Sequence, residues 1–109
     1  MRIAVAAEGS EDTAEVNGQA ARAPYFLICD GPDEVVELLE NPFGQHQRAM
    51  GLRIADFLAT KGVELFLARH FGEQFEQSLT QKGIQCRTTS GTVRDAVAAA
   101  YGAHGGPGT

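Results

Sequence analysis

From residue 50 onward, helix-like stretches alternate with short apolar stretches, and this alternation limits the folds that the chain can adopt. Apolar side chains recur at helical spacing between Met50 and Leu58 and again around Phe75. Short apolar stretches at residues 63–68 and 84–88 follow the helical ones. Because alternating strands and helices favour right-handed crossovers and parallel strands, this half of the chain predicts an α/β fold.

The ends of the predicted helices are marked by residues that stop or cap a helix. Gly62 and Gly83 follow the first two helices, and glycine readily adopts the left-handed conformation that ends a helix. Ser90 is expected to cap a third helix that runs from Thr92 to about Tyr101. The order of elements in this half is therefore α-β-α-β-α.

The first half of the chain predicts three strands. Residues 2–7 are short and apolar, as expected for a strand that is buried on both faces. Residues 25–30 and 34–40 have strand-like compositions and are separated by turn residues, so they predict a hairpin, although residues 34–40 could also form a turn of helix. A hairpin makes one strand antiparallel, so the expected sheet is mixed, with five strands in the order β-β-β-α-β-α-β-α.

The composition fits one small folded domain. The chain has 109 residues, of which 43% are hydrophobic and 21% are charged, which is sufficient for a single core. The net charge of -5 disfavours binding to nucleic acid or to an anionic membrane, and no apolar run approaches the roughly 20 residues of a membrane helix. We expect one domain over residues 1–101 and a flexible tail over residues 102–109, because the final HGGPGT lacks core-forming side chains.

The two cysteines, Cys29 and Cys86, lie far apart in the sequence and match no zinc-binding or C-x-x-C pattern. Cys29 alternates with Tyr25 along a strand and is expected in the core, whereas Cys86 is expected in the core or at a metal. The first residues, MRIAVAAEG, predict a strand rather than a signal peptide. We therefore expect a cytoplasmic protein with reduced thiols.

Several short motifs follow one another along residues 1–101. The chain begins with MRIAV and continues with NGQAARAPYF at residues 17–26 and with an Asn41-Pro42 loop that leads through His46 to Gly51. An apolar strand, a loop that contains Gly72, GIQC at residues 83–86 and TVRDAV at residues 92–97 complete the series. In order and spacing, these motifs resemble the dinitrogenase iron–molybdenum cofactor biosynthesis family, which includes the molybdenum–copper cluster "orange protein" relatives.

The resemblance implies a ribonuclease H-like, three-layer α/β fold and a non-catalytic protein that binds a molybdenum-containing metal–sulfur cluster of the Mo–Cu–S or Fe–Mo–S type. The implied partners are such a cluster and the proteins that donate or accept it. Relative to the family motif S-x-H-F-G-R-A-x-x-F, this chain keeps Arg22, Ala23 and Phe26. Gln19 and Ala21 stand where the family has its histidine and glycine.

Three polar loops of the predicted fold are candidates for ligand binding: residues 8–23, 41–51 and 68–72. The first and third loops follow strands that are expected to be parallel, so both should lie at the carboxyl edge of the sheet, where open α/β sheets bind ligands. The position of the second loop depends on the direction of the strand before it. Two helices would begin at this edge, near Gln47 and Gly72, and helix N-termini attract anions.

A metal–sulfur cluster of this kind is a polyanion that brings its own sulfides. Its binding therefore requires N–H donors and positive charge more than protein thiolates. The candidate cluster-binding residues are Gln19, Arg22, His46, Gly51, Arg69, His70 and Gly72, and Arg48 is a further cation. Cys86 and Met50 are candidates for direct contact with a metal, because thiolate and thioether sulfurs are soft ligands.

Each candidate also has an ordinary structural interpretation. His46 and His70 could be surface histidines, and Arg22 could pair with a carboxylate in the loop of residues 8–23. Cys86 and Met50 could belong to the core, and the glycines could be turn residues. The residue types alone do not separate these interpretations from a binding site.

Two other functions compete with cluster binding. An enzyme is disfavoured, because the strands carry no set of carboxylates for a two-metal nuclease and the chain has no G-K-[ST] phosphate loop. The second is a small regulatory or protein-interaction domain of the same fold that binds no metal, and the substitutions at Gln19 and Ala21 support it.

Overall fold

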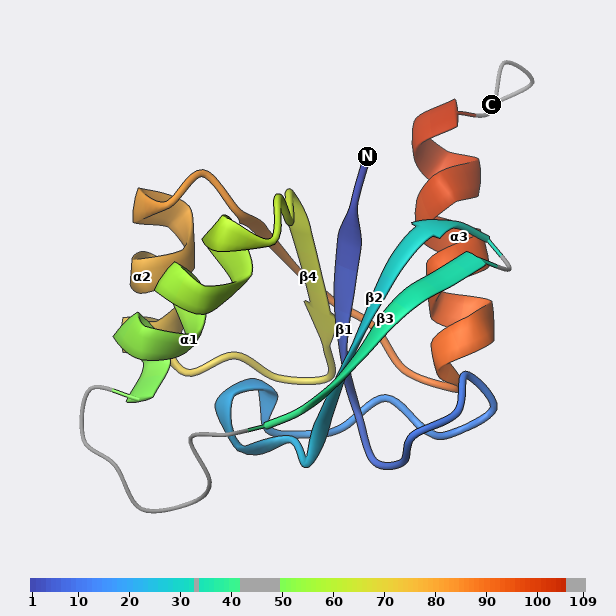
Figure 1. Ribbon diagram of the computed structural model, residues 1–109, viewed down its shortest axis with the longest axis horizontal. Coiled ribbons are helices and arrows are strands. Elements are labelled where there is room, and N and C mark those ends of the chain that lie inside the picture. Colours follow the sequence, from blue (N-terminus) through green and yellow to red (C-terminus); the bar gives the residue numbers. More distant parts are fainter. Residues whose placement is uncertain (33, 42–49, 106–109) are drawn as a thin grey trace.

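The described residues form one five-stranded mixed sheet, in the order β3-β2-β1-β4-β5 (Figure 1). The structure is a computed structural model that describes residues 1–32, 34–41 and 50–105. β1 (Ile3–Ala7), β4 (Leu65–Ala68) and β5 (Gln85–Thr88) are parallel neighbours, and β2 (Tyr25–Gly31) is antiparallel to both β1 and β3 (Glu34–Glu40). The expected mixed sheet is confirmed, and residues 34–40 form a strand rather than the alternative helical turn.

Three α-helices cover the two faces of the sheet, as Figure 1 shows. α1 (Met50–Thr60) and α2 (Glu73–Gln81) pack on one face, where Phe26 and Phe66 lie. α3 (Val93–Gly105) packs on the other face, against a core that includes Leu27. This three-layer arrangement, with one strand antiparallel to the others, matches the predicted ribonuclease H-like fold.

The central strand β1 is buried on both faces, and each of its five residues is 0% exposed. Ala4 and Ala6 belong to the core on the side of α1 and α2, so small side chains line the sheet there. On this side Phe66 meets both Phe26 and Phe75 edge-to-face, with ring centroids 5.7 Å apart in each pair. This geometry suits the aromatic quadrupoles and fills the space above the alanines.

The helix ends agree with the sequence analysis in part. Gly62 and Gly83 have φ angles of 77° and 81°, so their predicted role as helix stops is confirmed. The prediction that Ser90 caps the third helix is wrong, because the hydroxyl of Thr92 accepts the N–H of Asp95 at 3.2 Å. α3 begins at Val93, so Thr92 is its cap, and the helix continues to Gly105.

The edge of the sheet at which β1 begins is held together by polar contacts of Met1 and Arg2. Arg2 donates to both carboxylate oxygens of Asp30, at 2.8 and 2.9 Å, and to the carbonyl of Lys61 at 2.9 Å. The Tyr101 hydroxyl lies within hydrogen-bond distance of the carbonyls of Met1 and Cys29.

Cys29 is 2% exposed, so its expected place in the core is confirmed. None of the described helices is long and apolar enough to span a membrane.

Candidate functional site

The candidate loops begin at one edge of the sheet, the lower edge in Figure 1. Ala7 at the end of β1 pairs with Tyr25, and Glu40 at the end of β3 pairs with the same residue. The strand before the second loop therefore runs toward this edge, which decides the direction that the sequence left open. Asn41 is fixed there, because its N–H donates to Pro24 O and its Nδ2 donates to Ala23 O, each at 2.9 Å.

The candidates His46 and Arg48, together with Gln47, belong to residues 42–49, which lie outside the described residues. The contribution of this segment to a binding site therefore stays a prediction. The candidate cations that can be located, Arg22, Arg69 and His70, come from the first and third loops.

The first loop crosses the carboxyl ends of β1 and β4 through residues 16–20, which we call the crossing segment. The N–H of Asn17 donates to Ala6 O at 2.8 Å, and Asn17 O accepts the N–H of Arg69 at 3.1 Å. The N–H of Ala20 then donates to His70 O at 3.3 Å. Backbone hydrogen bonds thus join the first loop to the third.

The crossing segment is anchored by Val16, which is 0% exposed and belongs to the core beneath α3. Its N–H donates to Gly91 O at 2.9 Å. Val16 thus holds one end of the crossing segment, and Ala20, which is buried in the core beneath α1 and α2, holds the other.

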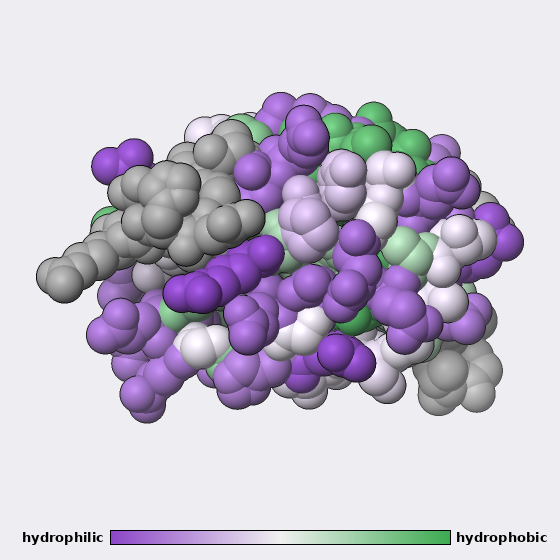
Figure 2. Space-filling model, turned by 90° about the horizontal axis from the view of Figure 1, so that it is seen from below, coloured by the Kyte–Doolittle hydropathy of each residue, from purple (hydrophilic) through white to green (hydrophobic). Residues whose placement is uncertain are grey.

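The joined loops surround a shallow hollow of about 320 Å³, which we call the arginine hollow. It is lined by Glu8, Asn17, Gly18, Gln19, Arg22 and Arg69. Neither arginine forms an ion pair with any residue that the structure describes, so the alternative in which Arg22 pairs with a loop carboxylate finds no support there. Figure 2 shows that the surface seen from this side is mainly hydrophilic.

Within the arginine hollow, Gly18 allows a guanidinium to lie against the backbone. A Cβ at Gly18 would stand 3.0 Å from Nη2 of Arg69, so a side chain there would have to displace that group. Asn17 Oδ1 accepts the N–H of Gln19 at 2.7 Å, which fixes the turn that presents Gln19. Glu8 and Asn17 line the hollow without having been predicted to do so, although Asn17-Gly18 is a recognisable turn signal.

Three other candidates lie outside the hollow's lining. His70 is exposed and contributes its carbonyl to the loop junction. Gly72 is the N-cap of α2, with nothing within 4 Å of an added Cβ. At Gly51 a Cβ would stand 2.9 Å from Cδ1 of Phe75 and 3.3 Å from its Cα, so this glycine permits the close packing of α1 on α2. A role for these three in binding a ligand stays a prediction.

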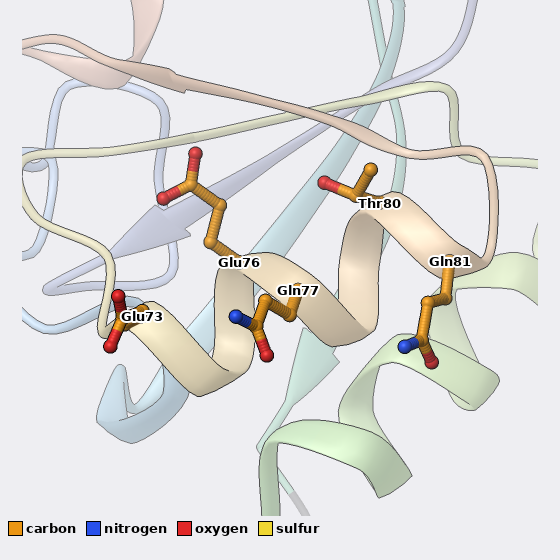
Figure 3. A pocket seen from close by; sticks show the side chains of 5 residues that line it. All are labelled: Glu73, Glu76, Gln77, Thr80 and Gln81. Atoms are coloured by element: carbon orange, nitrogen blue, oxygen red, sulfur yellow. The ribbon is translucent and has the colours of Figure 1, made fainter.

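The N-terminus of α2 is less available to an anion than the sequence suggested, whereas the predicted helix start near Gln47 lies outside the described residues. The first turn of α2 contains Glu73 and Glu76, whose negative charge neutralises the positive end of the helix dipole and repels a bound anion. Figure 3 shows these two glutamates along α2 beside a separate hollow of about 410 Å³, which is lined by Glu73, Glu76, Gln77, Thr80 and Gln81.

At the start of α3 the backbone N–H groups already have protein partners. Those of Val93 and Arg94 donate to Ala14 O and Asp12 O, at 2.9 and 2.8 Å. The cationic character of this edge therefore rests on the arginines.

The sulfur candidates lie apart from the arginine hollow. Cys86 is half-buried and packs against the core beneath α1 and α2, and burial, followed by the charge of Glu76, raises its pKa to about 11. Burial also raises the pKa of Cys29 to about 11. Both thiols are therefore protonated at neutral pH, a form that binds metals poorly. The side chain of Met50 lies outside the described residues.

The described residues contain no group of three or more His, Cys, Asp or Glu side chains that could hold a metal ion. The hollow instead offers guanidinium, amide and backbone groups together with the single carboxylate of Glu8. This donor set suits an anion that carries its own metal and sulfide, and it does not suit a bare metal cation.

Comparisons with known proteins identify the family and the fold of the chain. Residues 1–103 match the family model described as dinitrogenase iron-molybdenum cofactor. The chain is similar to the apo form of the orange protein from Desulfovibrio gigas, with 28% identity, a TM-score of 0.81, and coverage of 95% of this chain and 88% of the other.

It is also similar to a putative NifB protein from Thermotoga, described as a DUF35 family member, with 30% identity, a TM-score of 0.74 and the same two coverages of 95% and 88%. No curated protein matches the chain. Since the family model spans nearly the whole sequence, the chain belongs to the dinitrogenase iron–molybdenum cofactor family.

Proposed function

We propose that this protein binds an anionic metal–sulfur cluster without catalysing a reaction, and that it holds or carries the cluster at the arginine hollow. The observation that carries the proposal is the convergence of Arg22 and Arg69, from two loops, on one hollow of an acidic protein. Membership of a family named for the iron–molybdenum cofactor and likeness to an orange protein support the same ligand class.

The charges of the hollow fit this ligand. Two guanidinium groups and the carboxylate of Glu8 give it a positive balance, although the whole chain has a net charge of -5. Guanidinium N–H groups form charge-assisted hydrogen bonds, which are stronger than neutral ones. A sulfide-rich polyanion supplies the metal–sulfur bonds itself, so the protein has only to provide donors and positive charge.

The exposure of the hollow favours carriage over permanent storage. Gln19, Arg22 and Arg69 are all exposed, so a bound cluster would remain accessible to another protein. We therefore propose that the cluster, of the Mo–Cu–S or Fe–Mo–S type, is exchanged with donor or acceptor proteins. Both cysteines are free thiols, in keeping with a cytoplasmic location.

The test is reconstitution of the apo-protein. Tetrathiomolybdate, with and without copper(I), and separately an iron–molybdenum–sulfur precursor, are added, and unbound metal is removed by gel filtration. We expect visible absorption and a fixed ratio of molybdenum to protein in the protein fraction. Protein that stays colourless and metal-free with every reagent would contradict the proposal and would favour a regulatory domain that binds no metal.

A further inference from the structure

The outer edge of β3 has no part in the proposed cluster site. β3 stands at one end of the strand order, and no other described strand pairs with its outer side. In Figure 1, β3 runs in front of β2. Backbone N–H and C=O groups along an open edge can accept a further strand, which is a common mode of peptide recognition.

Apolar side chains of β3 remain exposed next to this edge. Val35, Val36 and Leu38 are 40%, 45% and 45% exposed. Val35 pairs with Cys29 and Leu38 pairs with Leu27, and both partners are buried in the core beneath α3. The apolar surface on this side of the sheet thus continues from the covered core to the open edge.

Negative charge recurs at regular spacing along the same strand. Glu34, Glu37 and Glu40 occupy every third position of β3. Glu37 forms an ion pair of 2.9 Å with Lys61, and the other two are exposed without ion pairs to described residues. A segment that pairs with this edge must therefore complement both the negative charges and the exposed apolar side chains of β3.

These charges argue against a second copy of the chain as the occupant. Pairing β3 with itself would bring two sets of glutamates together, and like charges on adjacent strands are destabilising. Each copy also has a net charge of -5, which opposes association. The pairing of β2 with β3 shifts in register between Ile28 and Cys29 and again between Cys29 and Gly31. Irregularities of this kind limit unselective pairing at sheet edges.

We propose that the outer edge of β3 binds a short extended segment of another protein. In this segment every third residue is lysine or arginine, and the residues between them are apolar. The backbone of this segment would add a sixth strand. Its apolar side chains would pack on Val35 and Leu38, and its cations would lie near Glu34 and Glu40. β3 ends at Glu40, at the edge where the arginine hollow lies, so such a partner would also be close to the proposed cargo.

The test is an NMR titration of the full-length, ¹⁵N-labelled protein without a cluster. The probe is the peptide Lys-Val-Val-Lys-Val-Val-Lys, and the matched control replaces each lysine with glutamate. We expect amide shifts and slowed hydrogen exchange within residues 34–40 for the lysine peptide, and no change for the glutamate peptide. Since no cluster is present, this result can fail independently of cluster binding.

Two exposed leucines provide matched variants. Leu38→Ser should weaken binding of the lysine peptide about tenfold, because it removes apolar surface at the contact. Leu52→Ser, on α1 and 46% exposed, should leave binding unchanged. Binding that is equal in both variants, shifts that lie outside residues 34–40, or a dimer whose β3 amides are already protected would each overturn the proposal.

Discussion

The backbone N–H of Arg69 donates a 3.1 Å hydrogen bond to the carbonyl oxygen of Asn17. This bond joins the loop after β4 to the loop after β1, and it does so through the main chain. The junction of the two loops therefore forms through the main chain, and the exposed side chains of Arg22 and Arg69 lie beside it, that of Arg69 against Gly18. Their replacement should change what the hollow binds without unfolding the protein.

Replacing either arginine should weaken the binding of tetrathiomolybdate. A hydrogen bond to a charged group contributes about 1.5–3 kcal/mol, so Arg22→Gln and Arg69→Gln should each reduce affinity roughly 10- to 100-fold. Arg53→Gln, which changes an exposed arginine of α1 by the same charge, should have little effect. Titration followed by absorbance measures the affinities, and equal affinities in all three variants would place the ligand elsewhere.

Gly51→Ala should destabilise the fold. An added Cβ would meet Cδ1 of Phe75 at 2.9 Å and its backbone Cα at 3.3 Å, so α1 would have to move away from α2. Overpacking of this kind costs about 1–3 kcal/mol. At Gly102 in α3 nothing lies within 4 Å of an added Cβ, so Gly102→Ala should be stabilising by up to about 1 kcal/mol. Urea denaturation distinguishes the two, and a stable Gly51→Ala variant would refute the packing role.

The contribution of Asp30 to stability should depend on pH. The hydrogen bond from Arg2 is the main cause that lowers the pKa of this carboxyl below its ordinary value of 3.8. The folded state therefore holds the proton less tightly than the unfolded state, and the stabilisation is present above that value and lost as pH falls through the lower folded pKa.

Denaturation midpoints of wild type and Asp30→Asn, measured from pH 7 to pH 2, test this relation. We expect Asp30→Asn to be less stable at neutral pH, with the difference shrinking below about pH 4. A difference that is constant across this range would exclude the ion pair as its cause.

The two thiols should react slowly with iodoacetamide in the folded protein. With pKa values of about 11, each has a thiolate fraction of only about one in a thousand at pH 8. Labelling of Cys86 should accelerate toward pH 11, whereas Cys29, which is 2% exposed, should react only on unfolding. Mass spectrometry of labelled peptides measures both rates.

The assignment of Cys86 as a metal ligand is tested by replacing it. Because its thiol is protonated at neutral pH and lines a hollow that shares no residue with the arginine hollow, we expect Cys86→Ser to retain tetrathiomolybdate binding. Loss of binding, with an unchanged unfolding midpoint, would instead identify this sulfur as a ligand.

The sequence contains enough information to predict that Arg22 and Arg69 lie at the same edge of the sheet. The order of strands and helices makes β1 and β4 parallel, and parallel strands bring their following loops to one edge. The direct junction between the loops is not readable in the same way. It depends on backbone hydrogen bonds of Asn17 and Ala20, and backbone groups are the same in every residue.

Two other features depend on boundaries that sequence patterns locate only to within one or two residues. Ser90 and Thr92 are both suitable caps, and the choice follows from the start of α3 at Val93. The effect of Glu73 and Glu76 on an anion at α2 likewise depends on the helix start, which is predicted near Gly72 and lies at Glu73. Val16 shows a different limit, since a single valine among small and polar residues has no periodicity from which its burial can be predicted.

The central place of β1 has a consequence for synthesis on the ribosome. The first strand to emerge finds one neighbour in residues 25–31, but its other neighbour, residues 65–68, is made much later. Until then, its apolar side chains lack half of their cover, and unburied strands of this kind are prone to aggregate. Translation speed and chaperone access while residues 8–68 are made should therefore affect the yield of native protein more than events during the synthesis of α3.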